Sequence, residues 1–121
     1  MGLDAVELVL RTEELFCISI GDDEAGAVRT VGDFYKLICT KLDLAPLPSP
    51  VTSGELPTIS HKEKTFLFLE KHTPLPVPPE LLPWSPQSVW NALAAVFVDQ
   101  QGLKAEEIRY HALIAQDLGV D

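Results

Sequence analysis

The position of the prolines constrains this fold more than any other feature of the sequence. All ten prolines of the 121-residue chain lie between Pro46 and Pro86. Proline lacks the backbone donor that a helix needs and its ring clashes with the preceding turn, so long helices are expected only outside this stretch. The flanking sequence has the periodicity of amphipathic helices. We therefore predict one domain over residues 1–121, in which two helical segments, 1–42 and 85–121, are joined by a proline-rich connector over 43–84.

The N-terminal segment is expected to form three helices. In the first, from Leu3 to Phe16, charged and apolar residues fall on separate stripes. The polar stripe is Asp4, Glu7, Arg11 and Glu14, and the core-facing stripe is Ala5, Leu8, Val9, Thr12, Leu15 and Phe16. A short helix is predicted near Asp23 to Val28. A longer one is predicted over Val31 to Leu42, with Thr30 as an N-cap that accepts a hydrogen bond from the amide of Asp33.

The C-terminal segment is expected to form one long helix and an irregular loop. Ser85 is a suitable N-cap, Pro86 suits the first helical position, and Gly102 can end the helix in a left-handed conformation. The predicted apolar face is Val89, Trp90, Leu93, Val96 and Phe97, and the later apolar anchors are Ile108, Leu113 and Leu118. The sequence thus predicts an all-α fold, a small bundle of four helices.

The two cysteines and three histidines suggest no chemistry. Cys17 and Cys39 are too few for a disulfide framework. Both lie in apolar stretches and are expected to be buried as small hydrophobic residues, with a reactive thiol as the alternative. His61, His72 and His111 lack the spacing of a zinc motif, so no metal site is expected.

The acidic residues also have a simple explanation. Asp22, Asp23 and Glu24 precede a short helix, where capping explains them and calcium binding is the alternative. Asp117 and Asp121 have no nucleophile or orienting partner beside them, so no catalytic residue is assigned and no enzyme is expected.

The charge of the chain limits its partners. A formal net charge of −9 argues against nucleic acid, whose phosphates need clustered Lys and Arg, and it favours basic partners. No apolar run approaches the roughly 20 residues that span a bilayer, and the start does not have the layout of a signal peptide. The expected location is cytoplasmic, with no membrane association.

The two ends of the sequence carry complementary parts of a known motif. Residues 117–121 read DLGVD and residues 2–9 read GLDAVELV. Joined in that order, they resemble the D-L-G-x-D-S-L-x-x-x-E-L signature of acyl carrier proteins. Residues 2–42 are similar to the second, third and fourth helices of that family, and 85–121 to its first helix and the loop that follows. The resemblance implies an acyl-carrier-like bundle in circularly permuted order.

One position departs from the family. Its serine carries a phosphopantetheine arm, whereas Gly2, flanked by Asp121 and Leu3, stands at that position here and has no hydroxyl. The resemblance therefore implies a non-catalytic protein without the phosphopantetheine cofactor, which acts by protein contact in a fatty-acid or polyketide-type pathway. The alternatives are a genuine carrier with its arm at a non-standard site such as Ser19, Ser85 or Ser88, or a structural dimerisation module.

In acyl carrier proteins the helix after the serine presents acidic and apolar side chains to its partners. The matching face here is Val6, Glu7, Leu10, Glu13 and Glu14. We expect it to meet the basic surface of a carrier-recognising protein. A solvated flank beside a wider core stripe is the alternative, since exposed apolar residues are common.

The connector is longer than closure of a bundle requires. Its apolar run from Thr65 to Leu69 is expected to pack on the bundle or on a second copy. The run from Pro74 to Pro79 is interpreted as a stiff spacer, with docking into an aromatic groove as the alternative. A connector of this length also permits a domain-swapped homodimer.

Overall fold

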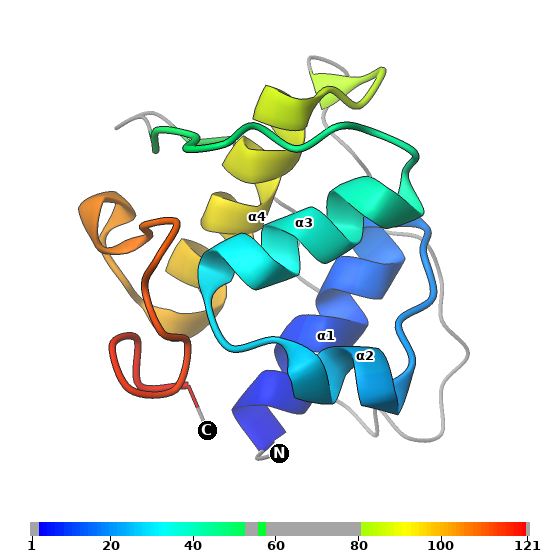
Figure 1. Ribbon diagram of the computed structural model, residues 1–121. Helices are drawn as coiled ribbons and strands as arrows, with labels where there is room; N and C mark the ends of the chain where they lie inside the picture. Colours follow the sequence, from blue (N-terminus) through cyan, green and yellow to red (C-terminus); the bar gives the residue numbers. More distant parts are fainter. Residues whose placement is uncertain (1–2, 53–55, 58–80, 121) are drawn as a thin grey trace.

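A computed structural model describes residues 3–52, 56–57 and 81–120 of the chain. These residues form four α-helices and one 3₁₀ turn, namely α1 (Leu3–Phe16), α2 (Asp22–Ala27), α3 (Val31–Lys41), α4 (Pro86–Gln101) and η2 (Ala105–Glu107). The described part contains no strand, and its β-pairing is confined to an isolated bridge between Thr30 and Leu113. The predicted all-α, four-helix fold is confirmed (Figure 1).

The capping residues set the helix boundaries. Thr30 Oγ1 accepts a hydrogen bond from Asp33 N at 3.0 Å, and Ser85 Oγ accepts one from Ser88 N at 3.1 Å. Gly102 ends α4 with φ of 66°, a left-handed conformation that glycine adopts without strain. These three predictions are confirmed, as are the bounds of α1.

Three other predicted boundaries, both ends of α2 and the end of α3, were each off by one residue. Helix α2 begins at Asp22 and ends at Ala27, because the Glu24 side chain accepts a hydrogen bond from Gly21 N at 3.0 Å and fixes Gly21 as the cap. Helix α3 ends at Lys41, and Leu42 caps it by donating its N–H to Ile38 O at 3.0 Å.

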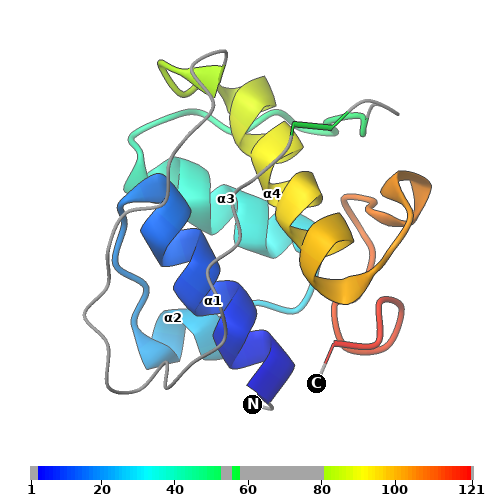
Figure 2. The same ribbon diagram turned by 180° about the vertical axis from the view of Figure 1, so that it is seen from behind.

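Helix α4 is the centre of the bundle and packs against both α1 and α3 (Figures 1 and 2). Its predicted apolar face is completely buried. Trp90 lies edge-to-face with Tyr35 at 5.3 Å between ring centroids, and Phe97 with Phe34 at 6.4 Å. Such pairs stabilise a core beyond the area that they bury. Residues from the two ends of the sequence therefore share one core.

The C-terminal segment, residues 102–120, closes one side of this core. Val31 N donates to Ala112 O at 3.0 Å, and Gly32 N donates to Tyr110 O at 2.8 Å. Both amides belong to the first turn of α3, where the backbone N–H groups have no acceptor inside their own helix. The predicted anchors Ile108 and Leu118 are buried, and Leu113 is half-buried.

Two charged residues of the predicted polar stripe on α1 are buried, so that part of the prediction was wrong. Arg11 is 7% exposed and Glu14 is 9% exposed. The guanidinium of Arg11 forms an ion pair with Asp99 of α4, with Nη2 and Oδ2 2.7 Å apart. Arg11 follows Leu8 by three residues and precedes Leu15 by four, so helical geometry places it on the core side.

The prediction for the cysteines was half correct. Cys39 is buried as expected, whereas Cys17 is exposed. Helix α1 ends at Phe16, and Cys17 has φ of 54°, which turns the chain away from the helix. An apolar neighbourhood in the sequence does not ensure burial at a helix end.

The described parts of the connector are attached to the bundle. The Tyr35 hydroxyl donates to Pro86 O at 2.8 Å and accepts from Leu47 N at 3.0 Å. The Thr52 hydroxyl donates to Ile108 O at 2.6 Å and accepts from Trp90 Nε1 at 3.1 Å. The predictions for residues 65–69 and 74–79 lie outside the described residues. None of the helices in the described ranges has the length and apolar character needed to cross a membrane.

Candidate functional site

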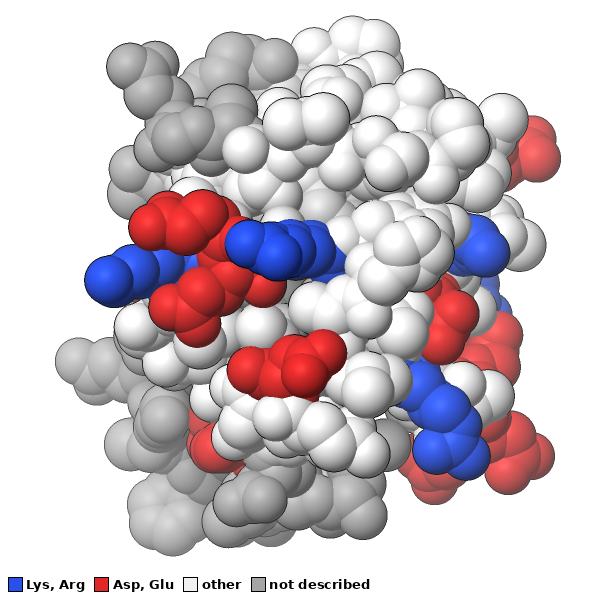
Figure 3. Space-filling model, turned by 60° about the vertical axis from the view of Figure 1, so that its left-hand side comes forward, with Lys and Arg blue, Asp and Glu red and all other residues white. Residues whose placement is uncertain are grey.

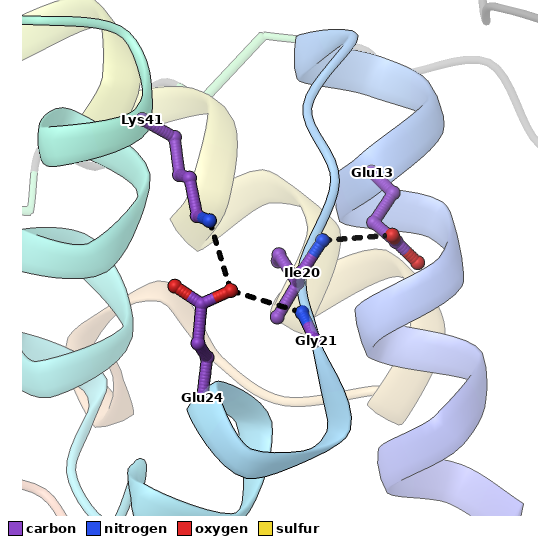
Figure 4. Close-up of polar contacts among 5 residues, drawn as sticks. All are labelled: Glu13, Ile20, Gly21, Glu24 and Lys41. Atoms are coloured by element: carbon purple, nitrogen blue, oxygen red, sulfur yellow. Dashed lines mark hydrogen bonds and ion pairs between the residues drawn. The ribbon is translucent and has the colours of Figure 1, made fainter.

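The expected partner face lies on α1. Val6, Glu7, Leu10 and Glu13 are half-buried, and Glu14 is buried. Glu13 also has a structural contact, because its Oε2 accepts a hydrogen bond from Ile20 N at 2.9 Å (Figure 4). Glu7 and Glu13 are thus the half-buried glutamates of this set, and Glu14 is the buried one. The assignment of the face to a partner stays a prediction.

Polar contacts close the N-terminal cap of α2 and join this helix to α3. The Glu24 carboxylate accepts hydrogen bonds from Gly21 N at 3.0 Å and from Lys41 Nζ at 2.8 Å (Figure 4). The bond from Lys41, followed by that from Gly21, lowers the pKa of Glu24. Helix α2 contains no buried residue. Its contacts with the bundle include the polar bond to Lys41 and the packing of the half-buried Ala25 against the core.

The described ends of the chain lie at the same end of the bundle (Figures 1 and 2). Gln100 Nε2 lies 3.5 Å from Asp4 O, which joins the end of α4 to the start of α1. Val120 and Ala5 line a common cavity. Gly2 and Asp121, the predicted counterparts of the modified motif, lie outside the described residues, and Leu3 is the first residue of α1.

The alternative attachment serines lie elsewhere. Ser85 and Ser88 bond to each other's hydroxyl and amide groups in the N-terminal cap of α4. Helix α4 has 16 residues, so this cap lies about 24 Å along the helix from the end that meets α1. Ser19 is exposed in the loop after α1. None of the three lies at the end of the bundle where α1 begins.

A cavity of about 430 Å³ lies between α1, α2, α3 and the C-terminal segment. Helix α1 contributes Ala5, Leu8 and Val9 to its wall. The C-terminal segment contributes Leu113, Ile114 and Val120. A site of this size is within the range of small-molecule pockets. The sequence analysis did not predict it.

One charged side chain lies at this cavity. Among the described residues that line it, Arg29 is the charged residue, and Gln116 has the other polar side chain. The backbone of Arg29 is fixed on both sides, since its N–H donates to Asp33 Oδ2 at 3.2 Å and its carbonyl accepts from Ile114 N at 2.9 Å. The residue is exposed. The backbone of Arg29 is thus held in place at the wall of the cavity.

The face shown in Figure 3 carries both acidic and basic side chains. On the face shown in Figure 3, blue and red side chains stand next to one another, and uncharged surface lies between the groups. Among the described residues, no group of three His, Cys, Asp or Glu side chains is arranged to hold a metal ion. Glu24, one of the residues considered for calcium, is bonded to Gly21 and Lys41.

Comparison with known proteins supports the resemblance seen in the sequence. Over 37 residues the chain is 58% identical to an acyl carrier protein of Sulfurovum sp. (strain NBC37-1). The chain is acyl-carrier-like over that segment. The match covers 31% of this chain and 49% of the relative, so the chain spans about half the length of the curated protein that it matches. No family model and no solved structure matches the chain.

Proposed function

We propose that this chain is a non-catalytic, acyl-carrier-like protein that acts by protein contact in a fatty-acid or polyketide-type pathway and bears no phosphopantetheine. The observation that supports the proposal is the similarity to an acyl carrier protein. The resemblance of the two chain ends to the family signature assigns Gly2 to the position of the modified serine. Attachment of the arm needs a side-chain hydroxyl, and Gly2 has none. The residues present do not fit the group.

The proposal includes circularly permuted order. Residues 85–121 correspond to the first part of an acyl carrier protein and residues 2–42 to the part that follows, which is the reverse of their order in this sequence. The contact between Gln100 and Asp4 supports it, and so does the cavity that Ala5 and Val120 share. Chain ends that lie close together at a surface are the condition under which reordering leaves packed contacts intact.

The proposed contact surface is the acidic side of α1. A basic partner would be oriented by Glu7 and Glu13, with Val6 and Leu10 between them as apolar contacts. Complementary charge of this kind increases the association rate and fixes orientation more than it adds affinity. A protein with this surface and no arm would occupy a docking site without delivering an acyl group.

The absence of the arm is tested by mass spectrometry. Purified protein is incubated with coenzyme A and a phosphopantetheinyl transferase, with a conventional acyl carrier protein as positive control. We expect the mass of the control to increase and that of this chain to stay unchanged. Addition of one phosphopantetheine group to the wild-type chain would refute this part of the proposal and favour a non-standard serine.

The contact is tested by competition with a conventional acyl carrier protein for an enzyme that recognises it. The Glu7→Lys variant should compete less well than the wild type. The matched control is Glu106→Lys, which makes the same change in net charge at an exposed residue of η2. Equal loss in both variants would indicate a non-specific effect of charge, and unchanged competition by Glu7→Lys would contradict the assigned surface.

A further inference from the structure

Residues 44–52, the part of the connector that follows α3, lie on the bundle with a period of three residues. Leu44 and Leu47 are half-buried and Pro50 is buried, whereas the residues between them are exposed. The chain bends at 48–49 without losing this spacing. A polyproline II helix has three residues per turn, so every third side chain points to the same side. The segment therefore turns one face to the bundle, as a bound proline-rich peptide does.

The bundle meets this segment with two aromatic side chains whose polar atoms bond to it. The Tyr35 hydroxyl accepts a hydrogen bond from Leu47 N at 3.0 Å, and Trp90 Nε1 donates one to Thr52 Oγ1 at 3.1 Å. Both rings are completely buried and pack edge-to-face at 5.3 Å. Domains that recognise extended proline-rich segments also use aromatic side chains. Tyr35 of α3 and Trp90 of α4 are called the aromatic site below.

The segment is held by side chains rather than by a ladder of backbone bonds. Within the described ranges, residues 45–52 form no backbone-to-backbone hydrogen bond with the bundle. The Thr52 hydroxyl also donates to Ile108 O at 2.6 Å, which ties the same residue to the C-terminal segment. A segment attached in this way can separate from the bundle without unfolding a helix, which makes its release a low-cost local opening.

We propose that the aromatic site recognises an extended proline-rich segment of a partner protein and is closed in this chain by its own residues 44–52. The bound segment defines the chemistry of the ligand. The ligand needs apolar residues at every third position, a backbone N–H for the Tyr35 hydroxyl and a side-chain hydroxyl for the Trp90 indole. The inference goes beyond the proposed function, since it uses neither the acidic side of α1 nor a modified serine.

The tether decides which occupant can replace the segment. Leu44 follows Lys41, the last residue of α3, by only three residues. A tether this short presents the segment at an effective concentration on the order of millimolar. A second copy of the chain offers the same segment without the tether, so it is at a disadvantage at lower protein concentrations. The ligand is therefore assigned to a separate protein whose segment binds more tightly.

The test is a titration of the full chain with the free peptide of residues 44–52, followed by the indole N–H signals in NMR spectra. Thr52→Val removes the hydroxyl that holds the segment and keeps the outline of the side chain. The peptide should shift the Trp90 signal and bind this variant about fivefold more tightly than the wild type, the factor for one hydrogen bond. Trp84 packs on Phe16 instead, so its signal is the internal reference and should not move.

Three matched controls make the test specific. Ser49→Ala removes an exposed hydroxyl of the same segment, and this variant should bind the peptide as the wild type does. A peptide with valine in place of its threonine should bind Thr52→Val about fivefold more weakly than the original peptide. A peptide of the same composition in shuffled order should leave the Trp90 signal unchanged.

The proposal is overturned if Thr52→Val does not bind the peptide, binds it no more tightly than the wild type, or binds the shuffled peptide equally well. Equal shifts of the Trp84 and Trp90 signals would also overturn it. In sedimentation, a wild-type dimer that the peptide dissociates would overturn the assignment to a separate protein. If Thr52→Val loses its helical circular dichroism, the wild-type titration decides, because only the ordered peptide should move the Trp90 signal.

Discussion

Substitution of Gly32 tests how the C-terminal segment is attached to the bundle. A Cβ at this position would lie 2.7 Å from Tyr110 O and 2.8 Å from Cε1 of the same residue. Two of the three nearest atoms belong to the ring of Tyr110 and the third to its backbone. Neither the ring nor the backbone can move easily. Gly32→Ala should push the segment away and break the hydrogen bond from Gly32 N to Tyr110 O.

The expected cost follows from these contacts. Overpacking of a buried site costs about 1–3 kcal/mol, and loss of the hydrogen bond about 1 kcal/mol. Replacement of glycine by alanine in a helix returns about 0.5–1 kcal/mol. The net decrease in the free energy of unfolding should be about 1–3 kcal/mol. With a urea dependence near 2 kcal/mol/M, the midpoint should fall by roughly 0.5–1.5 M.

The matched control is Gly26→Ala in α2. A Cβ at Gly26 would meet no atom within 4 Å. This variant should be as stable as the wild type or more stable by up to about 1 kcal/mol, through helix propensity alone. Both variants are measured by urea unfolding followed by circular dichroism. A Gly32→Ala protein as stable as Gly26→Ala would refute the close contact between α3 and the C-terminal segment.

Three further predictions follow from individual side chains. Burial raises the pKa of Tyr35 from 10.0 to about 12, so spectrophotometric titration should show a tyrosine that ionises near pH 12 and is missing in Tyr35→Phe. The folded protein holds this proton more tightly than the unfolded chain, so stability should fall as the pH rises from about 10 to 12, and this part of the fall should be absent in Tyr35→Phe. A thiol reagent should modify Cys17 in the native protein and Cys39 only after unfolding, because Cys39 is buried and desolvation raises its pKa; rapid reaction of both would contradict the core. Asp99→Asn should lower the free energy of unfolding by about 1 kcal/mol in urea titrations, a small effect because the Asp99 side chain is 49% exposed, and no change would mean that its bond to Arg11 adds nothing measurable.

The helices could be predicted because their signals are local. Thr30, Ser85 and Gly102 mark boundaries through their own backbone and side-chain chemistry, and the structure places helix ends at all three. Arg11 carries two conflicting signals. Its charge is typical of the polar stripe, whereas its spacing from Leu8 and Leu15 places it on the buried side, where the structure has it.

The parts of the site that arise from tertiary contacts could not be read from the sequence. The hydrogen bond from Gly32 N to Tyr110 O joins backbone atoms, whose pairing does not depend on a recognisable motif. The cavity beside Arg29 exists because the side chains of α1, α2, α3 and the C-terminal segment do not fill the space between them. A pattern within one helix indicates which side is apolar, but it does not indicate whether the opposing surfaces fill the space between them.

The most direct test of the central claim places the two segments in the order proposed for the family and adds a hydroxyl at position 2. A reordered chain would begin at residue 81, join Asp121 to Gly2 and end at residue 57, and it would be made with glycine or serine at position 2. If the chain is a permuted acyl carrier that lacks its serine, both reordered proteins should fold to the helical content of the described residues. With coenzyme A and a phosphopantetheinyl transferase, only the Gly2→Ser form should gain the mass of one arm. A reordered chain that does not fold would contradict the permutation, and a folded Gly2→Ser form that gains no mass would contradict the equivalence of Gly2 with the modified serine.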